Sequence, residues 1–109
     1  MKYVYIAGPY THDDPVLNTS NVIDVAEDLA KFGYIPYAPH LTMFWHFLYP
    51  HDIEFWYEYD LAWLLKCDCV LRIDGDSHGA DNEVEFAKTH DIPVFYTYQE
   101  LTEYNWKVG

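Results

Sequence analysis

The sequence has few basic residues. Six Lys and Arg stand against eighteen Asp and Glu in 109 residues, which gives a formal net charge of −12. A field of that sign repels both the nucleic-acid backbone and anionic membranes. We therefore exclude polymeric nucleic acid and membranes as partners, whereas local hydrogen-bond donors can still hold a small anionic ligand.

Long apolar runs, signal-peptide features and disulfide patterns are also missing. The first apolar stretch ends at Gly8 and Pro9, and no stretch approaches the ~20 apolar residues of a membrane span. We therefore expect a cytoplasmic protein. Cys67 and Cys69 do not have the common zinc or thioredoxin spacing, so we interpret them as reduced core residues.

Phosphate-binding glycine motifs are absent as well. The sequence contains neither GxGxxG nor GxxxxGK[ST], which removes the main support for ATP or dinucleotide binding. The six histidines do not have the HExxH spacing that places two of them on one helix face. We predict no metal site.

Apolar and aromatic residues, in contrast, are abundant. Half of the residues are apolar and 19% are aromatic, so enough surface can be buried to offset the chain entropy. We predict a single domain over residues 1–109, because this length gives room for one core. Rings are densest between residues 40 and 59, where core or oligomer interface is favoured over a ligand cage.

Periodicity predicts strands that alternate with helices. Strand-like runs lie at residues 2–7, 34–39, 68–73 and 92–98, and the two prolines of the second run indicate an edge strand. Helical spacing predicts one helix from about residue 22 to Gly33, capped by Ser20 or Asn21, and further helices at residues 53–66, 82–90 and 99–106. This order predicts an α/β fold: a single-domain, doubly wound, flavodoxin- or Rossmann-like parallel sheet of four to five strands with flanking helices.

Ligands of such sheets bind beyond the carboxyl ends of the strands, near the point where the strand order reverses. Four segments are expected on that rim, at residues 8–12, 39–46, 74–83 and 96–98. Gly8 on this rim lets backbone approach a ligand closely. Tyr5, in the preceding strand, is either a core tyrosine or a phenol aimed at a carboxylate in the pocket.

Two acids are candidates for chemistry at this rim. Five acids lie within residues 74–85, which form either a solvated acidic loop or the setting of Glu83, in the first turn of a helix, as nucleophile or base. Asp60 lies among aromatic residues on a helix, either as an exposed acid or as a buried one whose raised pKa lets it hold a proton. Glycosidic cleavage through a covalent intermediate requires one ionised and one protonated carboxyl.

Three segments resemble one known family. YIAGPY at the start, YxPHL at residues 37–41 and the stretch from Asp60 to Ala87 are similar to the nucleoside 2-deoxyribosyltransferase superfamily, which includes 2′-deoxynucleoside 5′-monophosphate N-glycosidases and short bacterial and phage members. The resemblance covers residues 3 to about 98. It implies cleavage of the N-glycosidic bond, with Glu83 attacking C1′, Asp60 protonating the departing base and Tyr5 orienting Glu83, and it requires no cofactor.

The same resemblance implies a set of substrate-binding positions: Gly8, Pro9, Thr11, His40, Ser77 and Gly79. Ser77 matches a serine that binds the 5′-phosphate in the monophosphate hydrolases. Those hydrolases carry Ser and Arg where this sequence has Pro9 and Thr11, so their cationic phosphate clamp is missing. Nucleosides and 5′-monophosphates both stay open as substrates, as do hydrolysis and transfer.

Family members assemble as dimers or larger oligomers with shared sites, so the resemblance implies a homo-oligomer with a small-molecule nucleoside or nucleotide as ligand. Two alternatives stay open. The missing arginine favours a nucleoside- or nucleotide-binding or sensing module that has lost catalysis. A weaker alternative is an oligomeric scaffold whose aromatic segment serves as an interface.

Overall fold

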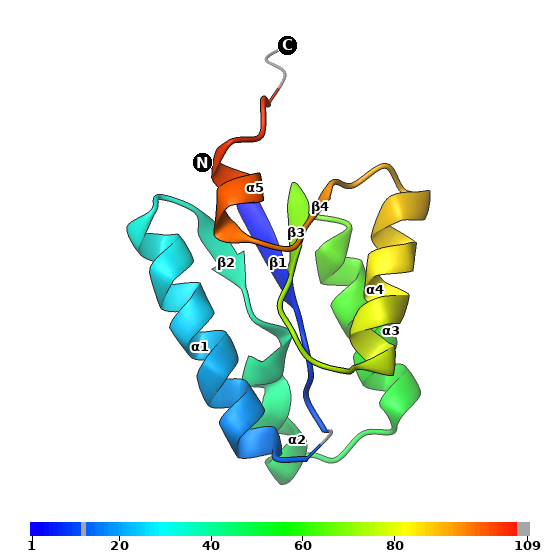
Figure 1. Ribbon diagram of the computed structural model, residues 1–109. Coiled ribbons are helices and arrows are strands. Elements are labelled where there is room, and N and C mark those ends of the chain that lie inside the picture. The colour runs from blue at the N-terminus through cyan, green and yellow to red at the C-terminus, as the bar shows by residue number, and fades with distance from the viewer. Residues whose placement is uncertain (12, 107–109) are drawn as a thin grey trace.

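Four parallel strands form the central sheet of the computed structural model, which describes residues 1–11 and 13–106 (Figure 1). They are β1 (Tyr3–Ala7), β2 (Ile35–Tyr37), β3 (Cys69–Arg72) and β4 (Val94–Phe95), and their order across the sheet is β2-β1-β3-β4. The predicted parallel α/β sheet is confirmed. The second strand lies at an edge as its prolines indicated, and it is only three residues long with Pro36 at its centre.

Helices cover both faces of this sheet. Side chains alternate along β1, so that Val4 and Ile6 pack toward α1 (Pro15–Lys31) and α5 (Tyr98–Thr102), whereas Tyr5 and Ala7 pack toward α3 (Ile53–Leu64) and α4 (His78–Thr89). Figure 1 shows α1 on one side of the strands and α3 with α4 on the other. We call these two sides the α1 face and the α4 face.

Helix α1 begins seven residues before the predicted start near residue 22. The Asp14 side chain accepts hydrogen bonds from the backbone N–H groups of Val16 and Leu17, at 3.0 and 3.1 Å, and Pro15 occupies the first helical position. The prediction of a loop up to Ser20, with Ser20 or Asn21 as the cap, is therefore wrong. The predicted end is confirmed, since Gly33 follows the helix with a φ of 92°.

Helix α4 also begins earlier than predicted, at His78 and not at Asn82. The Ser77 hydroxyl accepts a hydrogen bond from the Ala80 N–H at 3.1 Å, and this cap starts the helix inside the expected acidic loop. Glu83 consequently lies in the second turn of α4, whereas the sequence suggested the first.

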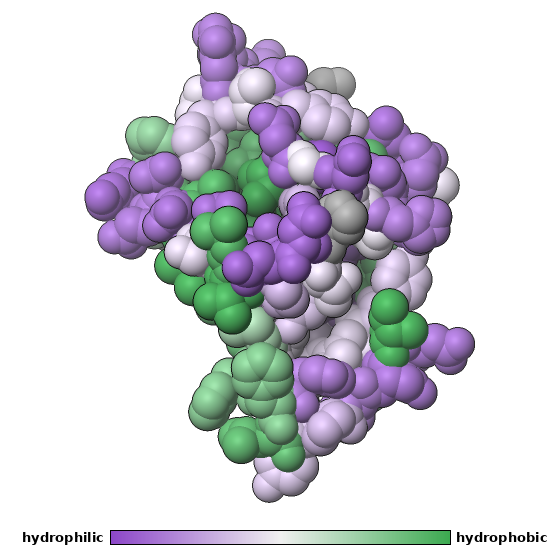
Figure 2. Space-filling model, turned by 60° about the horizontal axis from the view of Figure 1, so that its bottom comes forward, coloured by the Kyte–Doolittle hydropathy of each residue, from purple (hydrophilic) through white to green (hydrophobic). Residues whose placement is uncertain are grey.

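The segment rich in aromatic residues folds as a short 3₁₀ helix, η1 (Pro39–Thr42), and helix α2 (Met43–Leu48). Trp45 and Trp56 pack edge-to-face with a centroid distance of 4.9 Å, which ties α2 to α3. Other apolar side chains of this segment are exposed, and Figure 2 shows apolar side chains gathered at the lower left of the face it presents. We call four of these exposed residues the α2 patch: Leu41, Phe44, Phe47 and Leu48.

Both cysteines are free and buried, which confirms that they are core residues. Burial raises the pKa of the Cys67 thiol to about 11 and that of the Cys69 thiol to about 12, so both stay protonated at neutral pH. Within residues 1–11 and 13–106, no helix is long and apolar enough to cross a membrane.

Candidate active site

The strand order reverses between β1 and β3, and the loops that follow these two strands pack directly against each other. A Cβ on Gly8 would collide with Cγ1 of Ile73, so Ile73 occupies the space beside that glycine. Gly75 has a φ of 117°, and a Cβ there would lie 2.6 Å from Cγ of Pro9. The two glycines therefore let the loops interlock at the carboxyl edge of the sheet.

Tyr5 and Glu83 meet inside the protein on the α4 face. The Tyr5 hydroxyl donates a hydrogen bond to Oε2 of Glu83, joining β1 to α4. Tyr5 is fully buried and Glu83 is 9% exposed. Burial, followed by the negative charges of Glu83 and Asp60, raises the pKa of the Tyr5 phenol well above its ordinary value. Tyr5 therefore remains a protonated donor that fixes the carboxylate.

Asp60 extends from α3 toward the same pair. Burial and, to a lesser degree, the charge of Glu83 raise the pKa of Asp60 to about 8. Its Oδ1 atom is buried and has no hydrogen-bond partner among the described residues. A ligand that can exchange a proton or a hydrogen bond with Asp60 would satisfy this atom.

The two carboxyls differ in their surroundings. Burial raises the pKa of Glu83 to about 7, and the hydrogen bond from Tyr5 and the charge of Arg72 both oppose that rise. Burial and the charge of Glu83 both act on Asp60 in the same direction, and its pKa is the higher of the two. Near neutral pH the arrangement favours one ionised carboxyl, Glu83, beside one protonated carboxyl, Asp60, which suits a nucleophile and a proton donor.

Arg72, at the end of β3, also reaches this region, and sequence reasoning missed it. Its guanidinium donates to the carbonyl oxygens of Ile73 and Gly75, the latter at 2.9 Å, and to Oδ1 of Asp81 at 3.1 Å. The alternation of β3 was a usable signal, because Arg72 falls on the same side as Val70, which packs on the α4 face.

His40 holds the loop after β1. Its Nε2–H donates to the carbonyl oxygen of Pro9 at 2.6 Å, and the side chain is 5% exposed. Burial lowers the pKa of His40, so the imidazole is neutral at pH 7, and its Nδ1 has no partner within the described structure. Thr11 is exposed on the same loop, and His12, which the sequence places on this rim, lies outside the described residues.

The other predicted binding positions lie at the start of α4. Ser77 is partly buried and its hydroxyl oxygen caps the helix. Gly79, one residue into α4, has open space where a Cβ would lie. Beside this region, Tyr37 stacks between Tyr5 and Trp63, with centroid distances of 5.6 and 5.4 Å. The sequence did not reveal this three-ring wall, because the rings come from β2, β1 and α3.

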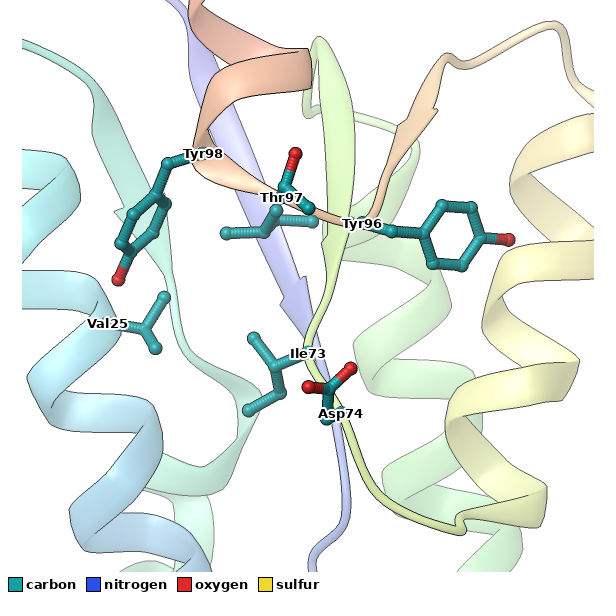
Figure 3. A pocket seen from close by; sticks show the side chains of 7 residues that line it. Val25, Ile73, Asp74, Tyr96, Thr97 and Tyr98 are labelled. Carbon is teal, nitrogen blue, oxygen red and sulfur yellow. The ribbon is translucent and has the colours of Figure 1, made fainter.

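A shallow pocket of about 210 Å³ lies on the other side of the sheet, on the α1 face (Figure 3). Figure 3 shows Val25 on α1 and Ile73 on the segment after β3, with the Tyr98 ring turned toward α1 and the Tyr96 ring turned toward α4. The Tyr98 hydroxyl donates to Asp28 at 3.0 Å, and the Thr97 hydroxyl caps α5. These two hydroxyl groups stabilise helices, whereas the buried acids Asp60 and Glu83 lie on the α4 face.

Comparison with solved structures gives a similar fold. A 2-deoxyribosyltransferase from the psychrotolerant bacterium Bacillus psychrosaccharolyticus, described as a biocatalyst for the synthesis of nucleosides, superimposes with a TM-score of 0.67. The likeness covers 95% of this chain and 93% of that one, at 16% sequence identity, and it shows the fold.

Comparison of sequences gives no match to a curated protein. A family profile, described as a domain of unknown function (DUF7768), matches residues 2–97. Since this match spans most of the chain, the protein belongs to that family.

Proposed function

We propose that residues 1–109 form a single nucleoside 2-deoxyribosyltransferase-like domain that cleaves the N-glycosidic bond of a 2′-deoxynucleoside or its 5′-monophosphate. The observation that carries the proposal is the buried hydrogen bond from Tyr5 to Glu83. Nearby, Oδ1 of Asp60 is buried and has no hydrogen-bond partner among the described residues. The resemblance of the motif around these residues and the fold of the transferase neighbour both support it.

In the proposed first step, a carboxylate oxygen of Glu83 attacks C1′ of the deoxyribose. The C1′–N bond breaks, its electron pair leaves with the base, and the proton of Asp60 passes to that base. Free base, an Asp60 carboxylate and a deoxyribosyl ester on Glu83 result. Tyr5 donates to Glu83 before attack and orients the oxygen that becomes the ester.

The second step releases the sugar. Water or the nitrogen of a second base attacks C1′, the ester bond to Glu83 breaks with its electron pair returning to the carboxylate, and the Asp60 carboxylate takes up the proton of the attacking group. Both carboxyls return to their starting states. The reaction requires no cofactor.

For the substrate, we propose contacts at the interlocked loops and the start of α4, where Ser77 and Gly79 lie. The loop after β1 contributes the backbone of Gly8 and Pro9 and the Thr11 hydroxyl, and His40 holds that loop in place. Ser77 favours a substrate with a 5′-phosphate, and the absence of the cationic clamp at Pro9 and Thr11 favours the uncharged nucleoside. Both substrate classes belong in the assay.

We also propose that the protein forms a homo-oligomer. The α2 patch exposes Phe44 and Phe47 at 67% and 65%, on a helix next to the loop that His40 holds. Clustered exposed rings of this kind mark interaction sites. A second copy seated there would bury these rings and supply further wall for the site.

The test compares Glu83→Gln with Glu85→Gln, an exposed neighbour on the same helix. Each protein is incubated with a panel of 2′-deoxynucleosides and 5′-monophosphates, with and without a second base, and free and exchanged bases are measured by chromatography. Glu83→Gln loses base release while circular dichroism shows a folded protein, and Glu85→Gln keeps it. Unchanged turnover in Glu83→Gln would sink the assignment.

The same panel separates the enzyme from a binding module. A wild-type protein that is thermally stabilised by a nucleoside or nucleotide but releases no base supports the non-catalytic alternative. A protein that is stabilised by none of the panel supports a scaffold.

A further inference from the structure

Arg72 is the sole arginine of the sequence, in a protein with a formal net charge of −12. It ends β3 in register with Ala7 of β1, directly before the interlocked loops. Its side chain is 10% exposed. Burying a guanidinium is costly unless its charge and its N–H groups are both compensated.

The hydrogen bonds compensate the N–H groups. Carbonyl oxygens of Ile73 and Gly75 accept from the two terminal nitrogens, so the guanidinium bridges two points of the loop between β3 and α4. That loop leads to Ser77, which caps α4 and thereby sets where Glu83 lies along the helix. Lysine has three donors on a point charge and cannot reproduce this planar fork.

The charge requires a separate explanation. Asp81 is the ion-pair partner of Arg72 at 3.1 Å, but its side chain is 68% exposed. An ion pair with one arm in water contributes little, typically about 0–1 kcal/mol. The exposed pair therefore does not account for a guanidinium that is nine-tenths buried.

Glu83 lies two residues beyond Asp81 on the same helix, and the charge of Arg72 acts on it, lowering its pKa. Four elements pack against α4, and the titratable groups that face Glu83 from them are Tyr5 on β1, Asp60 on α3 and Arg72 on β3. The described residues of β4, Val94 and Phe95, carry no charge. Tyr5 is neutral and Asp60 is acidic, so Arg72 provides the positive charge among these groups.

We propose that Arg72 is the positioning residue of this site, holding the loop between β3 and α4 with its fork and keeping Glu83 as a carboxylate nucleophile with its charge. The inference rests on the proposed function for the role of Glu83, but the effect of the Arg72 charge on the Glu83 pKa is a property of the folded protein. Two substitutions separate the effect of the Arg72 charge from that of its hydrogen-bonding fork. Arg72→Gln removes the charge, and Arg72→Lys keeps the charge but removes the fork.

The first readout is the pH titration of the Glu83 carboxyl carbon by ¹³C NMR, which needs no activity. The charge of Arg72 lowers the Glu83 pKa, so in Arg72→Gln the Glu83 titration moves to higher pH. In Arg72→Lys it stays close to that of the wild type. The control is Asp81→Asn, which removes the exposed ionic partner and leaves the two carbonyl contacts in place.

The second readout is kcat/KM for base release against pH. On the acid side of this pH profile, kcat/KM rises as Glu83 ionises. Arg72→Gln therefore moves this acid limb of the profile to higher pH. Below neutrality, kcat/KM then falls about ten-fold for every pH unit by which the limb moves. Arg72→Lys keeps the limb in place and raises KM, because the loop that carries Ser77 is no longer bridged. If Arg72 served only the stability of the fold, its substitution would move neither the acid limb of the kcat/KM profile nor the NMR titration of Glu83.

The proposal is overturned if folded Arg72→Gln leaves the Glu83 titration unchanged, or if Arg72→Lys shifts it as far as Arg72→Gln does. Should Arg72→Gln not fold, Arg72→Lys decides: a wild-type titration with a raised KM supports the proposal, and an unchanged KM overturns it. A wild-type protein that releases no base contradicts the proposed function alone, because the NMR titration still reports on Arg72 and Glu83.

Discussion

The two faces of the sheet are built from the same strands but differ in what they bury. On the α1 face, Val4 and Ile6 of β1 pack against apolar residues of α1 and α5, and the nearby polar pair, Tyr98 and Asp28, is only partly buried. On the α4 face, β1 presents Tyr5 to a buried glutamate. By the two-residue alternation of its side chains, β1 thus separates an apolar core from one that also contains a buried glutamate.

The α4 face, unlike the α1 face, buries acids at a cost in stability. Burial raises the pKa of both Asp60 and Glu83, which means that the folded protein disfavours their ionised forms. Such arrangements lower stability and cluster at functional sites. Matched substitutions on the two faces test this contrast.

Among the substitutions that compare the two faces, Asp60→Asn is expected to lower activity most. The amide cannot deliver a proton to the leaving base, so kcat for base release falls by about 10²- to 10⁴-fold. Asp28→Asn on the α1 face is the matched control; it weakens the contact from the Tyr98 hydroxyl and leaves kcat unchanged. Steady-state assays measure both, and equal losses in the two variants would contradict the contrast between the faces.

Truncation of one fully buried leucine on each face comes next. Leu29→Ala on α1 and Leu64→Ala on α3 each lower the free energy of unfolding by about 2–5 kcal/mol, measured by urea denaturation. Leu64 lies one turn beyond Asp60, so only its truncation also lowers kcat in the fraction that stays folded. A loss of kcat in Leu29→Ala would mean that the two faces are coupled.

The pH dependence of stability is a smaller effect with a definite sign. Folding raises the pKa of Asp60 from 3.8 to about 8 and that of Glu83 from 4.5 to about 7, so the folded state binds more protons than the unfolded state between these values. The stabilisation is complete below pH ~4 and is lost as the pH rises toward 8. Urea midpoints at pH 5, 6, 7 and 8 therefore decrease in the wild type. The double variant Asp60→Asn, Glu83→Gln flattens this slope, and a persisting slope would place its cause elsewhere.

The smallest effect compares two helix caps. Asp14→Ala at α1 and Ser77→Ala at α4 each lower the free energy of unfolding by about 0.5–2 kcal/mol, because each leaves helix N–H groups without an acceptor. Ser77→Ala additionally raises KM, since Ser77 is proposed to contact the substrate. Thermal unfolding and KM are measured for both, and a raised KM in Asp14→Ala would remove the distinction.

Much of the fold follows from the sequence. Buried strands and amphipathic helices have periods set by backbone geometry, so their order predicts a parallel sheet, and the rule for carboxyl edges places Glu83 on the rim. The pairing of Tyr5 with Glu83 came from the family resemblance. Both missed helix starts have one cause. Residues such as Thr19 and Gly79 have low helix propensity, but the caps at Asp14 and Ser77 and the packing of the helices override that preference.

The parts of the site that the sequence did not reveal depend on contacts between distant segments. The ring of His40 reaches the Pro9 carbonyl across 31 residues, and nothing in either segment indicates that bond. Arg72 was missed for the same reason. Its guanidinium binds carbonyl oxygens of a loop whose path depends on the packing of Gly75 on Pro9. Local sequence patterns predict which residues lie near the rim, whereas the geometry of the loops determines which hydrogen bonds each residue forms.

The edges of the sheet have a consequence for self-association. Strand β2 has three residues with Pro36 at its centre, and β4 has two residues directly after Pro93. Proline has no N–H to give to an added strand, and short edges offer few backbone groups for pairing. The two edges of this sheet therefore disfavour the edge-to-edge strand pairing that leads to aggregation.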